Sequence, residues 1–513
     1  MAGLQQCLGT LGLQLNAAKT KVWSAAGREA LLPVLLPYYT PALPVLGAVM
    51  KASDDNEEGS VLHLGGEPSG LDEVTKRLKS VWQTLTRLQK AGLSRQATAS
   101  LLRSYAGAAS QYALQLQLPT QESVQEYDGT LLKCWQELAD RSLDNNSQER
   151  LGLPLRYGGC GAQYASTRRY AAYWGSAAAT IGEVVLDNGF HSTASFLEAA
   201  PAASAKLEQA RAGLVRQGIS SLDGTALADA LHSKLNQSLL VALVQKRKQK
   251  ALLRSLPEHQ AADLRGAGGP GAAGFLEYPS EPVCSIEDTL WSVALRQRVG
   301  TTRAEASTSE LGNALQTCCC KAREGQPCNE QLDVHGFHAM TEQRGGGVMS
   351  RHNRLKRAIG GLIKRWCHQE PRYEQRVPAW DRQSRSNGSS STEHAILDIE
   401  YSDEHGTRWI DVTVRHPAAG GQPALRNAAT RDGEASRRGE REKHTRYPGN
   451  NLIPFVVETP GRIGAEGRFW LLAQVRCLPD DMQSKELDRA YRVISCAIQS
   501  EVSKQLRRAA GLK

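Results

Sequence analysis

The sequence predicts a multidomain α+β protein in which long helical regions precede a small α/β domain near the C-terminus. The chain has 513 residues, a length that corresponds to about three or four domains of ~100–200 residues each. Helical periodicity or helix-forming composition dominates 71–90 and 162–250. Short β-like runs gather instead in 394–459. The helical regions and the strand-rich region are therefore expected to belong to different domains.

The composition is that of a globular protein with a moderate positive charge. Hydrophobic residues make up 41% of the chain, and 62 Lys and Arg residues outnumber 53 Asp and Glu residues, which gives a net charge of +9. Such an excess favours polyanionic partners where the cations cluster on one face. The chain lacks an apolar run near the ~20 residues of a membrane span, and its first residues lack a secretory leader pattern. We therefore expect an intracellular protein without a membrane segment.

Residues 71–90 carry the clearest helical pattern. The apolar positions, at alternating spacings of four and three, share one helical face; they are Val74, Leu78, Val81, Leu85 and Leu88. Cations cover the rest of this helix, where they either meet a nucleic-acid backbone or are simply solvated. Residues 162–250 are rich in helix formers, and the glycines of 266–274 exclude a helix and predict a linker or exposed loop.

A cluster of cysteines and histidines follows the helical regions. Its members are Cys318, Cys319, Cys320, Cys328, His335 and His338. Thiolates and imidazoles are the usual ligands of structural zinc, and they surround it as a tetrahedron. Disulfides are rare inside the cell, so this local density indicates metal or redox chemistry rather than a disulfide framework.

The strongest polyanion signal is the basic segment over 349–385. An apolar stripe at helical spacing, from Leu355 to Trp366, predicts a helix that packs with one face while its cations point outward. We predict that this segment binds a DNA or RNA backbone, with salt-sensitive affinity and little sequence specificity. The candidate contact residues are Arg351, Arg354, Lys356, Arg357, Lys364 and Arg365.

Two β-like runs, 394–401 and 408–414, are separated by a turn sequence at 403–406, which predicts a hairpin. Asp398 lies on the first run and Asp411 on the second. Two carboxylates on paired strands can converge on one Mg²⁺, which activates water and neutralises charge that grows on a phosphate. Taken singly, acids on strands are mostly structural or solvated, so this pair alone does not establish a nuclease.

The order of motifs around this pair resembles the restriction-like, PD-(D/E)XK endonuclease domain of non-LTR retrotransposon polyproteins. Those domains show an acid strand, I-D-V-T-V, a helix with K-x-x-x-Y and a strand resembling P-x-V-V-E-T-x-G. Here I-D-V-T-V spans 410–414, the helical pair is Lys443 and Tyr447, and the last strand spans 454–461 with Glu458. The resemblance implies a Mg²⁺-dependent nuclease with Asp398 and Asp411 as metal ligands. It also implies that five residues serve catalysis, namely Asp398, Asp411, Lys443, Tyr447 and Glu458.

This chain departs from the family pattern at two positions of the nuclease. Thr413 stands where the usual motif has its lysine, so the resemblance implies that Lys443 supplies that ammonium from the helix. Leu397 stands where a proline is expected before the first acid. The second departure bears on the geometry of the ion site but leaves its carboxylate in place.

Segments before the nuclease resemble the same polyproteins. Residues 12–20 are similar to the reverse transcriptase palm pattern G-L-x-L-N-x-x-K-T, with 62–66 or 44–47 as the next palm motif, and 153–161 match L-P-x-R-x-G-G-x-G after the thumb. The family also has a zinc knuckle, whose pattern Cys318, Cys320 and His338 resemble, and we expect Cys328 as the fourth ligand of a Zn²⁺ ion. The knuckle's last cysteine is missing, with Thr341 near its place, so recruitment of Cys328, His335 or His352, or loss of the metal, stays open.

The resemblance implies an N-terminally truncated retrotransposon protein. Its segments would be a palm remnant (1–70), a thumb-like helical region (71–160), a helical linker domain (161–265), a knuckle with a basic helical region (275–385) and the endonuclease (386–513). The expected partners are target DNA and retroelement RNA, and the expected compartment is the nucleus. A Tyr/Phe-x-Asp-Asp polymerase motif is missing, so we predict no reverse transcriptase activity. The alternatives are a decayed nucleic-acid-binding remnant and a zinc-dependent structural or interaction protein.

Overall fold

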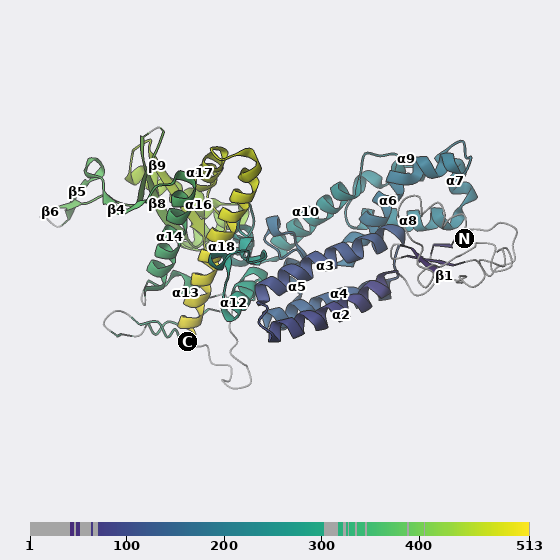
Figure 1. Ribbon diagram of the computed structural model, residues 1–513, viewed down its shortest axis with the longest axis horizontal. Helices are drawn as coiled ribbons and strands as arrows, with labels where there is room; N and C mark the ends of the chain where they lie inside the picture. The colour runs from purple at the N-terminus through teal and green to yellow at the C-terminus, as the bar shows by residue number, and fades with distance from the viewer. Residues whose placement is uncertain are drawn as a thin grey trace, which may run out of the picture. The chain divides into compact units, whose positions relative to one another are not determined.

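The computed structural model describes most of the chain from residue 70 onward, together with three short strands before it (Figure 1). The described residues are 42–45, 48–51, 63–64, 70–301, 317–321, 325–326, 328–333, 336–343, 346–386, 389–404 and 406–511. The palm motif predicted at 12–20 lies outside them. The described structure is mixed α+β and mostly helical, which confirms the predicted fold class at that level.

The chain forms two compact units. Unit 1 comprises 1–84, 104–133 and 163–247, and unit 2 comprises 85–103, 134–162 and 248–513. Each unit is therefore assembled from separate stretches of sequence, and the five segments expected from the sequence stay predictions. Among the described helices, none combines the length and the apolar composition that crossing a membrane requires.

Helices dominate the part of the chain before residue 256. They are α2 (Gly70–Lys90), α3 (Arg95–Leu116), α4 (Gln121–Ala139), α5 (Asn145–Gly152), α6 (Ala165–Asp187), α7 (Thr193–Ala199), α8 (Pro201–Arg216), α9 (Leu227–Leu231) and α10 (Gln237–Ser255). The strands β1 (Ala42–Val45), β2 (Ala48–Lys51) and β3 (His63–Leu64) form an antiparallel sheet in the order β1-β2-β3. The helix predicted over 71–90 is confirmed as α2, which buries Val74, Leu78 and Leu85 but leaves Leu88 exposed. The helical character predicted for 162–250 is also confirmed.

Unit 2 contains the remaining regular elements. Its later helices are α11 (Glu258–Gly266), α12 (Asp288–Val299), α13 (Phe337–Thr341), α14 (Gly347–Cys367), α15 (Gly421–Thr430), α16 (Glu434–Arg446), α17 (Ala465–Arg476) and α18 (Asp480–Ala509). Its strands are β4 (Arg372–Arg376), β5 (Arg382–Ser386), β6 (Ser389–Glu393), β7 (Ile396–Asp403), β8 (Gly406–Arg415) and β9 (Leu452–Glu458). Short 3-10 helices add Leu155–Tyr157, Gly274–Leu276, Pro282–Cys284 and Pro378–Trp380.

Four strands form the central sheet of unit 2 in the order β4-β7-β8-β9. Strands β7 and β8 pair antiparallel from Asp403↔Gly406 to Ile399↔Ile410, so the hairpin predicted from the sequence is confirmed. Strand β9 pairs parallel to β8, with Asp411 beside Pro454. Strands β5 and β6 form a separate two-stranded antiparallel hairpin.

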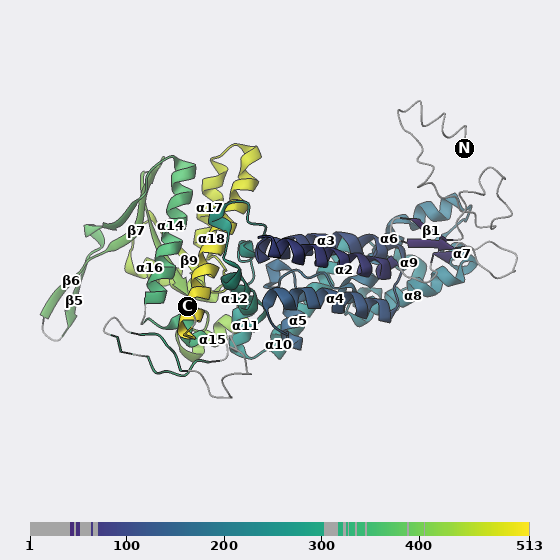
Figure 2. The same ribbon diagram turned by 60° about the horizontal axis from the view of Figure 1, so that its bottom comes forward.

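The main core of unit 2 lies between one face of this sheet and three helices. Helices α14 and α18 lie side by side in both views, and α17 packs on β9 (Figures 1 and 2). The predicted stripe on α14 is buried in this core together with Phe455 of β9, Trp470 of α17 and Ile498 of α18. The Phe455 and Trp470 rings meet edge to face, with centroids 5.8 Å apart.

A buried arginine stabilises the glycine-rich segments of unit 2. The Arg298 guanidinium, on α12, donates to the carbonyls of Leu155, Gly159, Ala267 and Ala272 at 2.9–3.2 Å. Burial lowers the pKa of Arg298 to about 10. The predicted break in the helix after residue 266 is confirmed, but the expectation of an exposed loop is wrong. Most of 267–276 is buried, because this guanidinium satisfies carbonyls that would otherwise need water.

Phe455→Ala should destabilise unit 2 by about 3–5 kcal/mol, because it removes a fully buried ring from the centre of the core. Phe469→Ala is the matched control. Its ring is 72% exposed on α17, so a change within about 0.5 kcal/mol is expected. Urea unfolding followed by circular dichroism measures both. Equal midpoints for the two variants would contradict this description of the core.

Candidate functional site

Two buried aspartates face one another across the β7–β8 hairpin. The paired register of β7 and β8 ends at Ile399↔Ile410, and Asp398 and Asp411 are the residues next to that last pair. Their residues are only 7% and 5% exposed. The two carboxyl groups interact both by charge and by a hydrogen bond.

Asp398 carries the negative charge of the pair. The Val412 amide donates to its Oδ2 at 2.7 Å, and His352 Nε2 lies 2.8 Å from its Oδ1. Burial by itself would raise the pKa of Asp398, but the His352 contact, the Val412 amide and Asp411 together hold that pKa below its usual value. The carboxylate therefore stays ionised although it is buried.

Asp411 has a different environment. Burial raises the pKa of Asp411 to about 6, the Lys443 ammonium opposes this rise, and the neighbouring Asp398 adds to it. Lys443 Nζ lies 2.8 Å from Asp411 Oδ2 as an ion pair. Beyond that ion pair, this buried oxygen has no hydrogen-bond donor among the described residues. Of the two acids, Asp411 is therefore the one that takes up a proton first, as the pH falls through about 6.

Lys443 reaches the pair from α16, a helix that is anchored at both ends. At its start, Glu458 accepts hydrogen bonds from the Ser436 amide at 3.0 Å and the Ser436 hydroxyl at 3.2 Å. At its end, the buried Tyr447 packs against Leu397, and its ring centroid lies 5.8 Å from that of Trp380. These contacts fix the helix and hence the position of Lys443.

The structure thus divides the five residues that the resemblance grouped together. It brings Asp398, Asp411 and Lys443 into contact, whereas Tyr447 and Glu458 stabilise the two ends of α16. In the register of β8 and β9, Glu458 lies beside Arg415, which is four residues after Asp411. Burial raises the pKa of Glu458. The side chain of Glu458 accepts hydrogen bonds from Ser436 of α16 and so belongs to that helix end, not to the acid pair.

Two residues of α14 contact the acid pair, although the sequence did not assign either of them to it. His352, considered as a zinc ligand, lies on Asp398 instead. Lys356, considered as a surface contact for nucleic acid, is 7% exposed, with Nζ 3.8 Å from Asp398 Oδ1 and a second ion pair to Glu374. The one sequence signal was their i, i+4 spacing, which places both on the same face of the predicted helix.

The other cations of α14 divide by exposure. Arg351 is buried, donates to the Met340 carbonyl at 3.2 Å and to Gln505 Oε1 at 3.0 Å, and has a pKa that burial lowers to about 10. The expectation that Arg351 meets a nucleic-acid backbone is therefore wrong, because its charge is used inside the fold. The remaining candidates are exposed: Arg354, Arg357, Lys364, paired with Glu370, and Arg365, paired with Glu486.

A second constellation forms around the cysteine cluster. Ligand atoms of Cys318, Cys328 and His338 all lie within 4.8 Å of one another, so they form a group that can hold a metal ion. Cys328 Sγ is 3.3 Å from His338 Nε2. Burial raises the pKa of Cys318 to about 11, as expected for a thiol without a cation beside it.

Two side chains are candidates for a fourth ligand. Glu342 Oε2 lies 2.9 Å from Cys328 Sγ and 3.5 Å from His338 Nε2. The Cys320 amide donates to Cys318 Sγ at 3.4 Å. Neither the Cys320 thiol nor the Glu342 carboxylate belongs to the converging group of three. Glu342 is a ligand candidate that the sequence did not indicate, and His335 lies outside the described residues. The Thr341 hydroxyl is bonded to carbonyls of its own helix.

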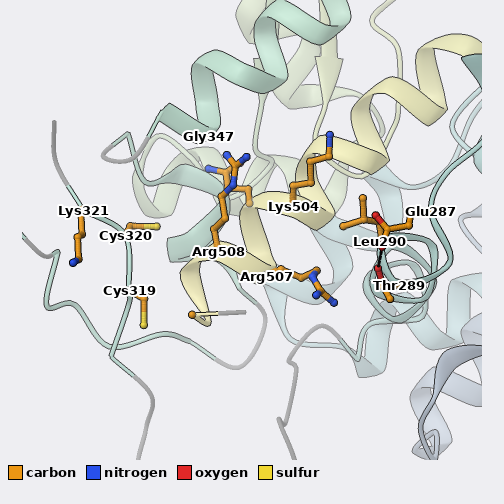
Figure 3. Close-up of a pocket in the computed structure, with 12 residues that line it drawn as sticks. Glu287, Thr289, Leu290, Cys319, Cys320, Lys321, Gly347, Lys504, Arg507 and Arg508 are labelled. Carbon is orange, nitrogen blue, oxygen red and sulfur yellow. Dashed lines mark hydrogen bonds between the residues drawn. The ribbon is translucent and has the colours of Figure 1, made fainter. Parts of the chain in front are cut away.

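The cysteine loop also borders a pocket of about 910 Å³. Figure 3 shows Cys319, Cys320 and Lys321 along this loop and Lys504, Arg507 and Arg508 on α18. The Cys319 amide donates to the Ala509 carbonyl at 2.9 Å, which ties the loop to the end of that helix. The charged residues that line this pocket are four cations, Lys321, Lys504, Arg507 and Arg508, and one acid, Glu287.

No protein-family model matches the chain, and none of the curated proteins is significantly similar to it in sequence. The resemblance to non-LTR retrotransposon nucleases therefore stays a prediction that rests on the motifs and on the geometry of the site.

Asp411→Asn should stabilise the protein at neutral pH. A carboxyl group whose folded pKa is raised contributes stability below its unfolded pKa of about 4 and loses that contribution as the pH rises through about 6. The variant has no such loss. Its free energy of unfolding should therefore exceed that of the wild type by an amount that grows from pH 4 to pH 7 and reaches about 1–3 kcal/mol. Urea unfolding at a series of pH values measures this difference. A difference that does not vary with pH would contradict the assigned environment of Asp411.

Proposed function

We propose that the C-terminal region of unit 2 is a divalent-cation-dependent DNA endonuclease that belongs to a retroelement protein. The observation that carries this proposal is the convergence of Asp398, Asp411 and Lys443 from two strands and a helix. Two acids and an ammonium at one point are the groups that metal-assisted phosphodiester hydrolysis requires. They also occur in the order that the family pattern implies.

The acid pair fits a magnesium ion. Carboxylate oxygens are the ligands that this hard cation prefers, and Asp398 and Asp411 offer such oxygens side by side at a buried position. The raised pKa of Asp411 means that a second negative charge in this site is disfavoured, and a bound cation would offset that cost. When bound, Mg²⁺ would supply a water of lowered pKa and neutralise charge on the phosphate.

The residues of the chain would have distinct roles in this reaction. Asp398 and Asp411 would hold the cation, and Asp411 would give up its proton when the cation binds. Lys443 would remain close to the acids as an ammonium that stabilises negative charge developing on the phosphate. The anchored ends of α16 keep this ammonium in place before DNA arrives, so little reorganisation is needed.

The exposed cations of α14 would hold the DNA backbone. Arg354, Arg357, Lys364 and Arg365 lie on the same helix as His352, so a strand bound there would run past the acid pair. Backbone contacts of this kind give salt-dependent affinity and little sequence specificity. In the proposed setting the partners are target DNA and retroelement RNA, and the place of action is the nucleus. The chain itself would not polymerise DNA, because the acidic polymerase motif is missing from its sequence.

We also propose that the cysteine cluster binds a structural zinc ion. Cys318, Cys328 and His338 offer two sulfurs and a nitrogen, and Glu342 or Cys320 would complete the tetrahedron. The ion would link the cysteine loop to α13, and the same loop is tied to α18. Its role would be to fix this part of unit 2, since it lies on residues separate from the acid pair.

The purified full chain should nick supercoiled plasmid DNA in the presence of Mg²⁺ and lose this activity with a chelator. Asp411→Asn and Lys443→Ala should each lower the rate by about 100-fold or more, since the first removes a ligand of the cation and the second removes the ammonium that acts at the phosphate. Asp488→Asn and Lys485→Ala are matched controls on the exposed surface of α18 and should nick like the wild type. Salt-sensitive DNA binding without nicking would contradict the nuclease and favour a decayed nucleic-acid-binding protein.

The chain should retain about one zinc ion per molecule after dialysis, as measured by elemental analysis. Cys328→Ser should abolish this retention, whereas Cys319→Ser, on the same loop but exposed, should not. Glu342→Gln and Cys320→Ser identify the fourth ligand, because only the ligand's variant should release the ion. Full retention by Cys328→Ser would show that this cluster does not bind the zinc.

A further inference from the structure

His352 contacts the acid pair from an element that carries none of the residues predicted for catalysis. It lies near the start of α14, and its Nε2 is 2.8 Å from Asp398 Oδ1. Its side chain is 24% exposed, so the contact is partly protected from water. Lys356, one helical turn later, lies 3.8 Å from the same oxygen.

The two oxygens of Asp398 are held from two directions. The Val412 amide comes from the neighbouring strand and bonds Oδ2, whereas His352 comes from the helix and bonds Oδ1. A carboxylate with a donor on each oxygen has a defined plane and cannot rotate freely. Asp411 is held differently: its Oδ2 lies 2.8 Å from Lys443 Nζ, and its carboxyl group shares a hydrogen bond with Asp398.

The helix that carries His352 is itself firmly placed. Its neighbours Leu355 and Ile359 are fully buried in the main core of unit 2. Arg351, the residue just before His352, is fixed by its hydrogen bonds to Met340 and Gln505. Lys356 also pairs with Glu374 on β4. A side chain that starts from such a helix has few alternative positions, so the contact with Asp398 is a built feature.

We propose that His352 is a positioning residue of the candidate nuclease site. It holds the Asp398 carboxylate in the orientation in which its free lone pairs and Asp411 face one divalent cation. It touches neither the cation nor the phosphate, and it acts through Asp398 alone. The role needs only an N–H donor at the position of Nε2, so it does not depend on a change of charge in the ring. This inference rests on the proposed metal-dependent function.

The experiment measures Mn²⁺ binding to the full chain by electron paramagnetic resonance, with plasmid nicking measured in parallel. Mn²⁺ replaces Mg²⁺ because it prefers the same oxygen ligands and is directly detectable. His352→Leu, which keeps the bulk but removes the donor, should weaken Mn²⁺ binding by about 10–100-fold, the usual effect of removing a group that orients a ligand. His352→Gln, whose amide can reach a similar position, should restore most of the affinity.

His394→Leu is the matched control. His394 Nδ1 lies 3.1 Å from Asp381 Oδ2, so this variant removes another histidine–aspartate contact of unit 2 that does not involve the acid pair. Its Mn²⁺ affinity should equal that of the wild type. His352→Ala is a second donor-free variant, which replaces His352→Leu if the leucine does not fold.

The outcomes separate this inference from the proposed function. A wild type that binds Mn²⁺ but does not nick DNA would overturn the nuclease, while the Mn²⁺ affinities of the variants would still decide the role of His352. Equal affinities in the wild type and the donor-free variants would overturn the positioning role. A wild type that does not bind Mn²⁺ would also overturn the positioning role of His352. Weak binding in both His352→Leu and His352→Gln would show that the ring is needed for packing rather than as a donor.

Discussion

The candidate site depends on the energetic cost of placing two carboxylates opposite one another in a buried hairpin. Two negative charges at this distance and depth repel each other strongly, because little water is present to screen them. The protein accommodates them asymmetrically. Asp398 stays charged because it receives hydrogen bonds from Val412 and His352, and Asp411, beside Lys443, takes up a proton as the pH falls through about 6. A divalent cation would compensate both carboxylates, and this is the physical basis on which we propose metal binding.

The rest of unit 2 positions the groups that relieve this repulsion. Helix α14 is buried along its apolar stripe and brings His352 to the first acid. Helix α16 is held at its start by Glu458 and at its end by Tyr447, and it brings Lys443 to the second. Residues of the same motifs therefore contribute to the site in different ways. Only some of them touch the acids, and the others hold the helices from which the contacting side chains extend.

The sequence could predict the parts of this site that depend on local pairing. The turn at 403–406 fixes the hairpin register, and Asp398 and Asp411 meet just beyond its last pair, Ile399↔Ile410. Lys443 followed from the family pattern. His352 and Glu342 could not be predicted, because each meets its partner through the packing of elements whose contacts leave no periodic signal. The burial of Arg351 and of residues 267–276 was missed for a related reason, since charge and glycine content indicate exposure unless a specific hydrogen-bond partner is known.

The central claim is that Asp398 and Asp411 share one proton that a divalent cation displaces. Calorimetric titration of Mg²⁺ into the full chain at pH 6, in buffers of different ionisation enthalpy, measures that proton directly. The account predicts release of about half a proton per bound ion at pH 6, where Asp411 is about half protonated, and almost none at pH 8. Binding without proton release at pH 6, or no binding at either pH, would contradict it.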